Sequence, residues 1–136
     1  MADPESRYRL VPYVSPNGKK PVQEFLNSLE ETGPDAAAVF YDLIAPLVKK
    51  HGGALGMPHF KYLPPTDFSE IRWDGKDRGH HRVYCTIESG GRILLVHGVT
   101  KRWPKFTHGD KRICKKRYSD YCSGEYDYQG RLSNSE

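Results

Sequence analysis

The sequence predicts an α+β fold with an N-terminal strand, two helices, a three-stranded antiparallel meander and a C-terminal helix. Apolar residues recur at helical spacing between residues 22 and 50, and they alternate with polar residues in short segments between residues 68 and 102. Turn-forming residues separate those segments, and short connections favour antiparallel neighbours. Because the helices precede the meander, helices and sheet are expected to form separate layers.

The first predicted elements are an edge strand and two helices. Residues 8–14 (YRLVPYV) predict a strand, and Pro12 favours an edge position because it has no backbone N–H to donate. Apolar residues at i, i+3, i+4 and i+7 then predict one buried helical face, formed by Val22, Phe25, Leu26 and Leu29. A second helix is predicted over residues 35–50, with a kink or break at Pro46. Residues 54–67, rich in Pro and Gly, are predicted to form a loop.

Three strands and a further helix are predicted after that loop. The strands are residues 68–73 (FSEIRW), 80–87 (HHRVYCTI) and 92–102 (RILLVHGVTKR). Alternation gives the first two strands one apolar face and one face of Arg, His, Tyr and Glu side chains. We expect the helices to cover the apolar face and to leave the cationic face open. Residues 107–121 predict a basic C-terminal helix.

Length and composition favour a single soluble domain. A chain of 136 residues with 37% hydrophobic residues is expected to form one domain over residues 1–121 and a polar, flexible tail over residues 122–136. No apolar run approaches the about 20 residues of a membrane span, and the N-terminus has no apolar signal segment. The three cysteines form no CxxC pair, which is typical of free thiols in a reducing compartment. These features predict a cytoplasmic protein that does not contact a membrane.

Positive charge is concentrated in the middle of the chain. The formal net charge is +4, but residues 59–117 carry 14 basic and 6 acidic side chains, whereas residues 1–58 carry 6 basic and 7 acidic ones. Residues 118–136 carry 1 basic and 4 acidic side chains. A block of this kind favours a polyanionic partner, and a solvated basic surface is the alternative interpretation.

The motifs in residues 8–121 resemble those of the RelE/HigB superfamily of toxin–antitoxin toxins, especially its phage-related HigB-like branch. The resemblance is carried by SPNGKKPVQEFLNSL at the start, FSEIRW and HHRVYC in the sheet, and LLVHGVTKRWPK after it. It implies a RelE-like arrangement of the α+β fold and an endoribonuclease that cleaves mRNA, often on the ribosome. It also implies a metal-free reaction in which the ribose 2′-OH attacks the adjacent phosphate, and an antitoxin protein as partner.

The resemblance ranks the residues expected at the site. Arg82 matches the strand arginine of the superfamily and can hold a phosphate with two hydrogen bonds. Lys101 and Arg102 match its paired lysines, and His80 shares the Arg82 face as a possible acid or base near neutral pH. These four are the predicted catalytic residues. The predicted RNA contacts are Lys61, Arg72, Tyr84, Trp103, Lys105 and Lys111, with Trp103 as a platform for an unstacked base.

Several interpretations remain open from the sequence. Tyr84 can instead pack in the core with its hydroxyl at the surface, and His97 can be a buried, hydrogen-bonded histidine. No cofactor and no metal site is expected, because the His and Cys residues lack ligand-like spacing. Trp103 and Thr107 depart from the superfamily pattern. They leave two alternatives to the enzyme: a non-catalytic RNA- or ribosome-binding protein, and a phage-type protein-interaction module.

Overall fold

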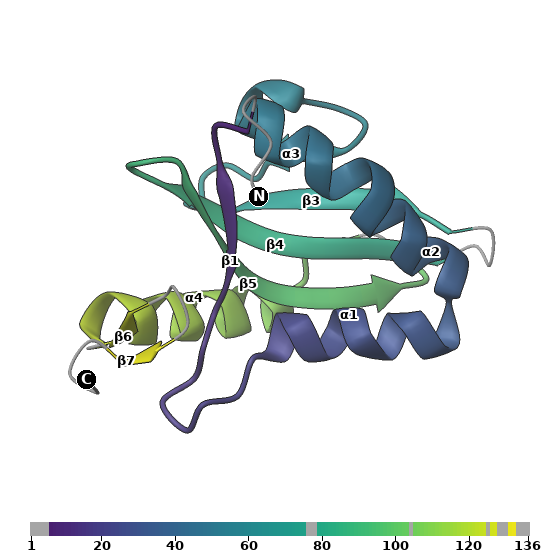
Figure 1. The fold of residues 1–136 in the computed structure, drawn as a ribbon. Helices are drawn as coiled ribbons and strands as arrows, with labels where there is room; N and C mark the ends of the chain where they lie inside the picture. Colours follow the sequence, from purple (N-terminus) through teal and green to yellow (C-terminus); the bar gives the residue numbers. More distant parts are fainter. Residues whose placement is uncertain (1–5, 76–78, 104, 125, 128–130, 133–136) are drawn as a thin grey trace.

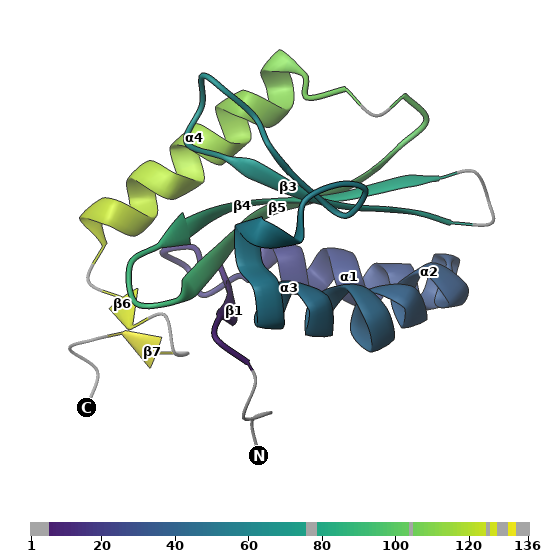
Figure 2. The same ribbon diagram turned by 90° about the horizontal axis from the view of Figure 1, so that it is seen from above.

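A five-stranded mixed sheet lies between two helical layers (Figures 1 and 2). The computed structural model describes residues 6–75, 79–103, 105–124, 126–127 and 131–132. The strands of the sheet are β1 (Arg9–Pro12), β2 (Phe60–Tyr62), β3 (Ser69–Asp74), β4 (His80–Glu88) and β5 (Arg92–Lys101). One face carries α1 (Pro21–Thr32), α2 (Pro34–Val39) and α3 (Ala45–His51), and the other carries α4 (His108–Ser123).

The α+β class is confirmed, but the sheet is larger than the predicted meander. The order is β1-β5-β4-β3-β2, with β1 parallel to β5 and the other pairs antiparallel. The edge position predicted from Pro12 is therefore confirmed. The prediction of a loop over residues 54–67 is wrong at β2. That strand is three residues long and buries only Phe60, so it shows too little alternation to be recognised from sequence.

The predicted interruption at Pro46 is confirmed as a widened turn. A π-helical segment, Phe40–Ile44, joins α2 to α3, and the Ala45 backbone N–H donates to the Phe40 carbonyl five residues earlier. Pro46 has no N–H to donate to the Asp42 carbonyl, and its ring crowds that carbonyl. The wider turn relieves this conflict without breaking the helix.

Two hydrophobic cores occupy the two faces of the sheet. The first packs α1, α2 and α3 onto the face that includes Ile71, Trp73 and Val83. The second joins Cys114 of α4 to the sheet residues Tyr84, Leu94 and Val96 and to Val11, Tyr13 and Phe68. The prediction of an open cationic face is therefore wrong. Apolar residues on that face bury themselves against α4, and Arg82 is only 1% exposed.

The end of the chain follows α4. Residues 122 and 123 complete that helix, and β6 (Tyr126–Asp127) pairs antiparallel with β7 (Arg131–Leu132). Gly124 caps α4, and residues 125, 128–130 and 133–136 of the tail predicted to be flexible lie outside the described residues. No helix in the described ranges is long and apolar enough to cross a bilayer.

Candidate functional site

Polar side chains on the α4 face of the sheet form rows across neighbouring strands. Directly opposed residues on paired strands point to the same face, so the register decides which side chains lie side by side. From the middle of the sheet to its end, the rows are Glu70–Tyr84–His97, Arg72–Arg82–Val99 and Asp74–His80–Lys101. His80, Arg82 and Lys101, predicted from sequence to act together, therefore lie at one end of β4 and β5.

A β-bulge in β5 brings His97 and Lys101 to this face. The register pairs around it are Tyr84–His97 and Cys85–Leu95, which leave Val96 as the extra residue. Val96 lies in the core beneath α4, and the His97 ring next to it stacks on the Tyr84 ring at 5.8 Å. If β5 instead alternated regularly through Val96, His97 and Lys101 would turn to the opposite face.

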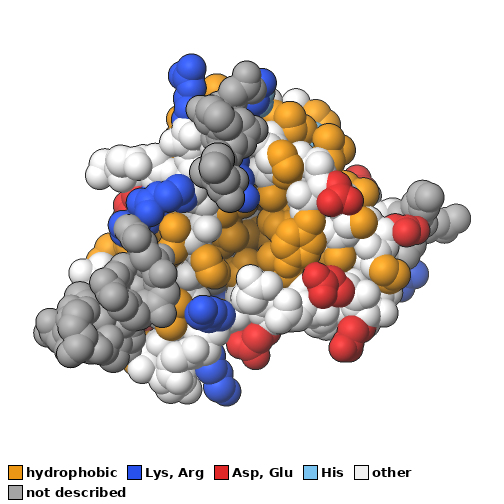
Figure 3. All heavy atoms as spheres, viewed as in Figure 1, with side chains coloured by type: hydrophobic (Ala, Val, Ile, Leu, Met, Phe, Trp, Pro, Cys, Tyr) orange, Lys and Arg blue, Asp and Glu red, His pale blue; other side chains and the backbone are white. Residues whose placement is uncertain are grey.

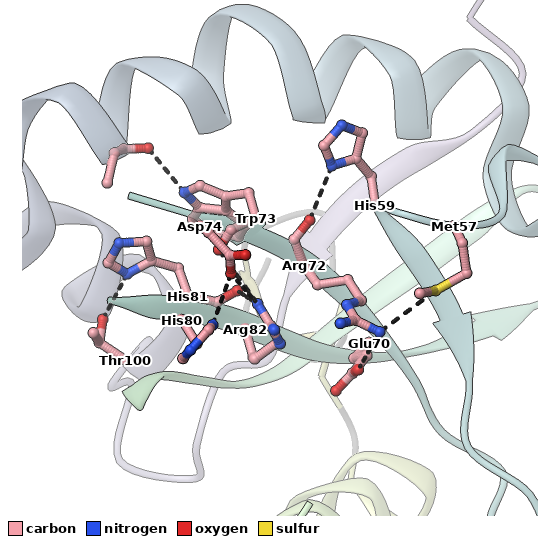
Figure 4. Close-up of polar contacts among 11 residues, drawn as sticks. Met57, His59, Glu70, Arg72, Trp73, Asp74, His80, His81, Arg82 and Thr100 are labelled. Carbon is pink, nitrogen blue, oxygen red and sulfur yellow. Dashed lines mark hydrogen bonds and ion pairs between the residues drawn. The ribbon is translucent and has the colours of Figure 1, made fainter. Parts of the chain in front are cut away.

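Asp74 binds both His80 and Arg82 at the end of the sheet (Figure 4). Its Oδ1 atom lies 3.0 Å from His80 Nδ1 and 3.3 Å from Arg82 Nη1. Partial burial raises the pKa of Asp74, but hydrogen bonds from His80 and Arg82 outweigh burial and hold that pKa below its usual value. Asp74 is therefore an anion near neutral pH. It orients the His80 ring through Nδ1, so Nε2 stays available to another partner.

The buried Arg82 side chain stabilises the end of the sheet through hydrogen bonds. Its Nη1 atom donates to the backbone carbonyl oxygens of Trp73 and His81 as well as to Asp74. Its Nε atom is buried and has no hydrogen-bond partner among the described residues. The direct phosphate contact predicted for Arg82 stays a prediction. By contrast, the His80 side chain is 29% exposed and can meet a ligand from solvent.

Asp110 in the first turn of α4 ties the end of β5 to the helix. Its Oδ1 atom lies 3.0 Å from His97 Nε2, and its Oδ2 atom accepts hydrogen bonds from Lys101 Nζ and Thr107. Thr107 and Asp110 also form a capping box. Burial raises the pKa of Asp110, but hydrogen bonds from Lys101, Thr107 and His97 hold it below its usual value. The Lys101 ammonium is thus anchored, 5.6 Å from the centre of the Tyr84 ring.

His97 is held in its neutral form. Burial lowers its pKa, and this outweighs the opposing hydrogen bond and charge of Asp110, while Arg117 and Lys101 lower the pKa further. Neutral His97 donates from Nε2 to Asp110. The interpretation of His97 as a buried, hydrogen-bonded histidine agrees with its side-chain exposure of 12%.

The lowered pKa of His97 predicts a pH dependence of stability. The unfolded chain binds a proton near pH 6.5, whereas the folded chain resists protonation until lower pH. The free energy of unfolding should therefore fall as the pH drops below about 6.5, and this loss should end below the folded pKa. Urea denaturation of wild type and His97→Gln between about pH 7.5 and 5 checks this. The glutamine variant should show a flatter profile, while a variant of the exposed His51, His51→Gln, should follow wild type.

Three predicted RNA-contacting or catalytic side chains lie exposed just beyond β5. Arg102 and Lys105 are exposed, and Trp103 is 79% exposed, the most exposed of the large hydrophobic side chains described. The Lys105 carbonyl oxygen accepts a hydrogen bond from Lys101 Nζ, which ties this segment to the site. Arg102, Trp103 and Lys105 make an accessible aromatic and cationic surface beside Lys101, and we call these four residues the 101–105 corner.

The other predicted RNA contacts lie further away or are less accessible. Lys61 is exposed on β2 in the row of His97, three strand spacings or roughly 14 Å across the sheet, and Lys101 lies four residues further along β5. Arg72 pairs with Glu70 at 3.5 Å, and Lys111 lies 5.7 Å from the centre of the Phe106 ring. Tyr84 is fully buried and packs in the core, but its hydroxyl is not at the surface, and burial raises its pKa.

Comparison with known protein families identifies the family to which the chain is related. Residues 24–119, from α1 to α4, match the family described as Phage derived protein Gp49-like (DUF891). The chain belongs to the Gp49-like family. This family is RelE/HigB-like and associated with toxin–antitoxin systems, so the resemblance seen in the motifs is confirmed at that level. No curated protein matches the sequence.

Two carboxylates of this Gp49-like site were missed by sequence reasoning. Asp74 follows the predicted strand directly and precedes Gly75, so it has the position of an ordinary turn residue. Asp110 had a clearer signal, because Thr107 three residues earlier completes a capping-box spacing. Within the described ranges, no three His, Cys, Asp or Glu side chains are grouped so that they could hold a metal ion.

Proposed function

We propose that the chain is the toxin component of a toxin–antitoxin system, of the phage-related HigB-like branch, and that it cleaves mRNA as an endoribonuclease. Membership of the Gp49-like family supports the toxin assignment. The 101–105 corner supports RNA as the substrate, because it places an exposed indole among cations that can contact phosphates. The cellular partners are mRNA and the ribosome in the cytoplasm, and an antitoxin protein that covers the basic surface.

The reaction follows from the groups beside that corner. His80 Nε2 accepts the proton of the ribose 2′-OH while Asp74 holds the ring through Nδ1. The 2′ oxygen then forms a bond to phosphorus, and the bond to the 5′ oxygen breaks. The products are a 2′,3′-cyclic phosphate and a 5′-hydroxyl, which takes its proton from water, and the hydroxide so formed takes the proton back from His80. Lys101 and Arg102 stabilise the negative charge that develops on the phosphorane.

The exposure of the Trp103 side chain is the observation that most directly supports this proposal. The Trp103 indole is 79% exposed, so its face is accessible to a ligand, and covering it would remove apolar area from water. A base unstacked from mRNA would lie on the ring while Arg102 and Lys105 contact the flanking phosphates. Stacking on one base contributes about 1–3 kcal/mol.

Trp103→Ala is expected to weaken binding of a short single-stranded RNA by about tenfold, in keeping with the loss of one stacked base. Fluorescence anisotropy measures the binding. Trp103→Phe keeps a ring and should retain most of the affinity. The proposed activity is tested by incubating wild type with naked mRNA in EDTA and with ribosome-bound mRNA in a magnesium buffer that keeps the ribosomes intact, and mapping the cut ends. If no cuts bearing cyclic phosphates arise on either RNA, the enzyme assignment fails.

A specific observation favours a second candidate, a non-catalytic RNA- or ribosome-binding protein. Arg82 is buried and bound to protein oxygen atoms, and Lys101 is paired with Asp110, so both cations already have partners. Such a protein would bind RNA through the 101–105 corner and leave it intact. Binding that Trp103→Ala weakens, without any cleavage by wild type, would select this candidate. A phage-type protein-interaction module would show neither RNA binding nor cleavage.

A further inference from the structure

The helical segment of residues 34–51 is apolar on both its inner and its outer side. Its inner side is buried against the sheet through Ala36, Ala37, Phe40, Ile44, Ala45 and Val48. Its outer side exposes Val39 (37%), Tyr41 (40%) and Leu43 (48%), and Ala38 and Pro46 are also exposed. A helix on the surface of a monomer normally has a polar outer side, and one that is apolar all round is normally covered on both sides.

This outer apolar side lies on the helical face of the molecule. Figure 3 shows that face, where apolar side chains gather over the helical layer and acidic side chains lie beside them. Of the residues from Ala36 to Val48, Asp42 alone is charged, and Lys49 follows them. We call the exposed residues Val39, Leu43 and Pro46, together with Asp42 and Lys49 along one flank, the outer stripe.

The charges of the outer stripe are self-complementary. Asp42 and Lys49 are seven residues apart, about two helical turns, so they lie on roughly the same side of the helix. Both side chains are exposed, and neither makes an ion pair with another described residue. If a second copy lies antiparallel about a two-fold axis, each Asp42 faces the Lys49 of the other copy. The two-fold symmetry then makes two equivalent Asp42–Lys49 ion pairs between the copies.

The same symmetry places Pro46 beside the axis. The midpoint between positions 42 and 49 lies between residues 45 and 46, so two Pro46 rings meet where the helices cross. Pro46 has no N–H, and its exposed ring can pack without leaving a donor unpaired. Antiparallel helices also align their dipoles favourably. An unrelated partner would need its own surface with charges and apolar side chains that complement the outer stripe. A second copy already has such a surface.

We propose that the chain forms a symmetric homodimer through the outer stripe, with the two helical segments antiparallel and Asp42 of each copy opposite Lys49 of the other. This inference goes beyond the proposed function and does not depend on it. The segment has 18 residues and is about 27 Å long, so the interface is at the small end for a stable complex. Dimerisation in the micromolar range is therefore expected.

Charge-reversal variants test this dimer by sedimentation velocity over protein concentrations of about 1–200 µM. Wild type should shift from monomer to dimer as concentration rises. Asp42→Lys and Lys49→Glu each place like charges opposite one another twice, so each should weaken dimerisation at least about tenfold. An equimolar mixture of the two variants should form a heterodimer, and the double variant Asp42→Lys with Lys49→Glu should dimerise again.

The control is Lys115→Glu, an equal charge reversal at an exposed position on α4, which should dimerise like wild type. Circular dichroism confirms that each variant is folded, and the recovery in the double variant separates a lost contact from a lost fold. A wild type that stays monomeric throughout overturns the proposal. So does a dimer that Lys49→Glu leaves intact, or a double variant that does not recover.

Discussion

Lys101→Ala is expected to lower the rate of RNA cleavage by about 10²- to 10³-fold, the effect of removing one preorganised group that stabilises transition-state charge. The Lys101 ammonium is anchored by Asp110 and lies in the same row as His80, one strand away. Its side chain is only 10% exposed, so in the proposed reaction its charge would act on the phosphorane with little screening by water. Single-turnover kinetics on an RNA whose cleavage ends have been mapped measure the effect.

The expected loss lies in kcat more than in KM. The 101–105 corner keeps Arg102, Trp103 and Lys105 in the variant, so RNA can still bind. Lys101→Arg keeps the charge and should recover part of the rate. Lys115→Ala on α4 removes an exposed cation outside the site and should cleave like wild type. If folded Lys101→Ala cleaves within about threefold of wild type, Lys101 does not stabilise the transition state.

The direction of side chains along the strands could be predicted from sequence, but their burial could not. Alternation is a property of the extended backbone, so His80, Arg82 and Tyr84 were correctly assigned to one face. Whether that face is open depends on where α4 packs. Cys114, Tyr118 and Tyr121 of α4 supply the apolar contacts, but within a strongly basic segment they are hard to recognise as a buried side.

Local irregularities and tertiary contacts explain the remaining differences between the structure and what the sequence predicts. No particular residue type in the sequence marks the bulge at Val96. The bulge nevertheless determines that His97 and Lys101 face α4. The contact of Lys101 with Asp110 joins two elements whose relative position only the tertiary structure defines. The widened turn before Pro46 was more predictable, because a proline inside a helix removes a specific hydrogen bond.

Trp73→Ala is expected to lower the free energy of unfolding by about 3–5 kcal/mol, the usual range for deleting a large buried aromatic side chain. Trp73 is 3% exposed in the core between the sheet and the helical layer. Its ring lies 4.9 Å from that of Phe40 and 5.6 Å from that of His81. Alanine would leave a cavity between β3 and α2 that neither neighbour can fill without shifting its backbone. Urea denaturation at pH 7.5 measures the loss.

Trp73→Phe separates packing from hydrogen bonding. The indole Nε1 atom donates to the Ala36 carbonyl oxygen at 3.0 Å, a contact between β3 and the first turn of α2. Phenylalanine keeps most of the apolar contact but loses this hydrogen bond, while the Ala36 carbonyl still accepts from the Phe40 backbone N–H, so a smaller loss of about 0.5–1.5 kcal/mol is expected. If both variants lose the same amount, the hydrogen bond and not the ring volume dominates the contribution of Trp73. If Trp73→Ala loses under about 1 kcal/mol, the helical layer closes the cavity and is less rigidly packed than these contacts indicate.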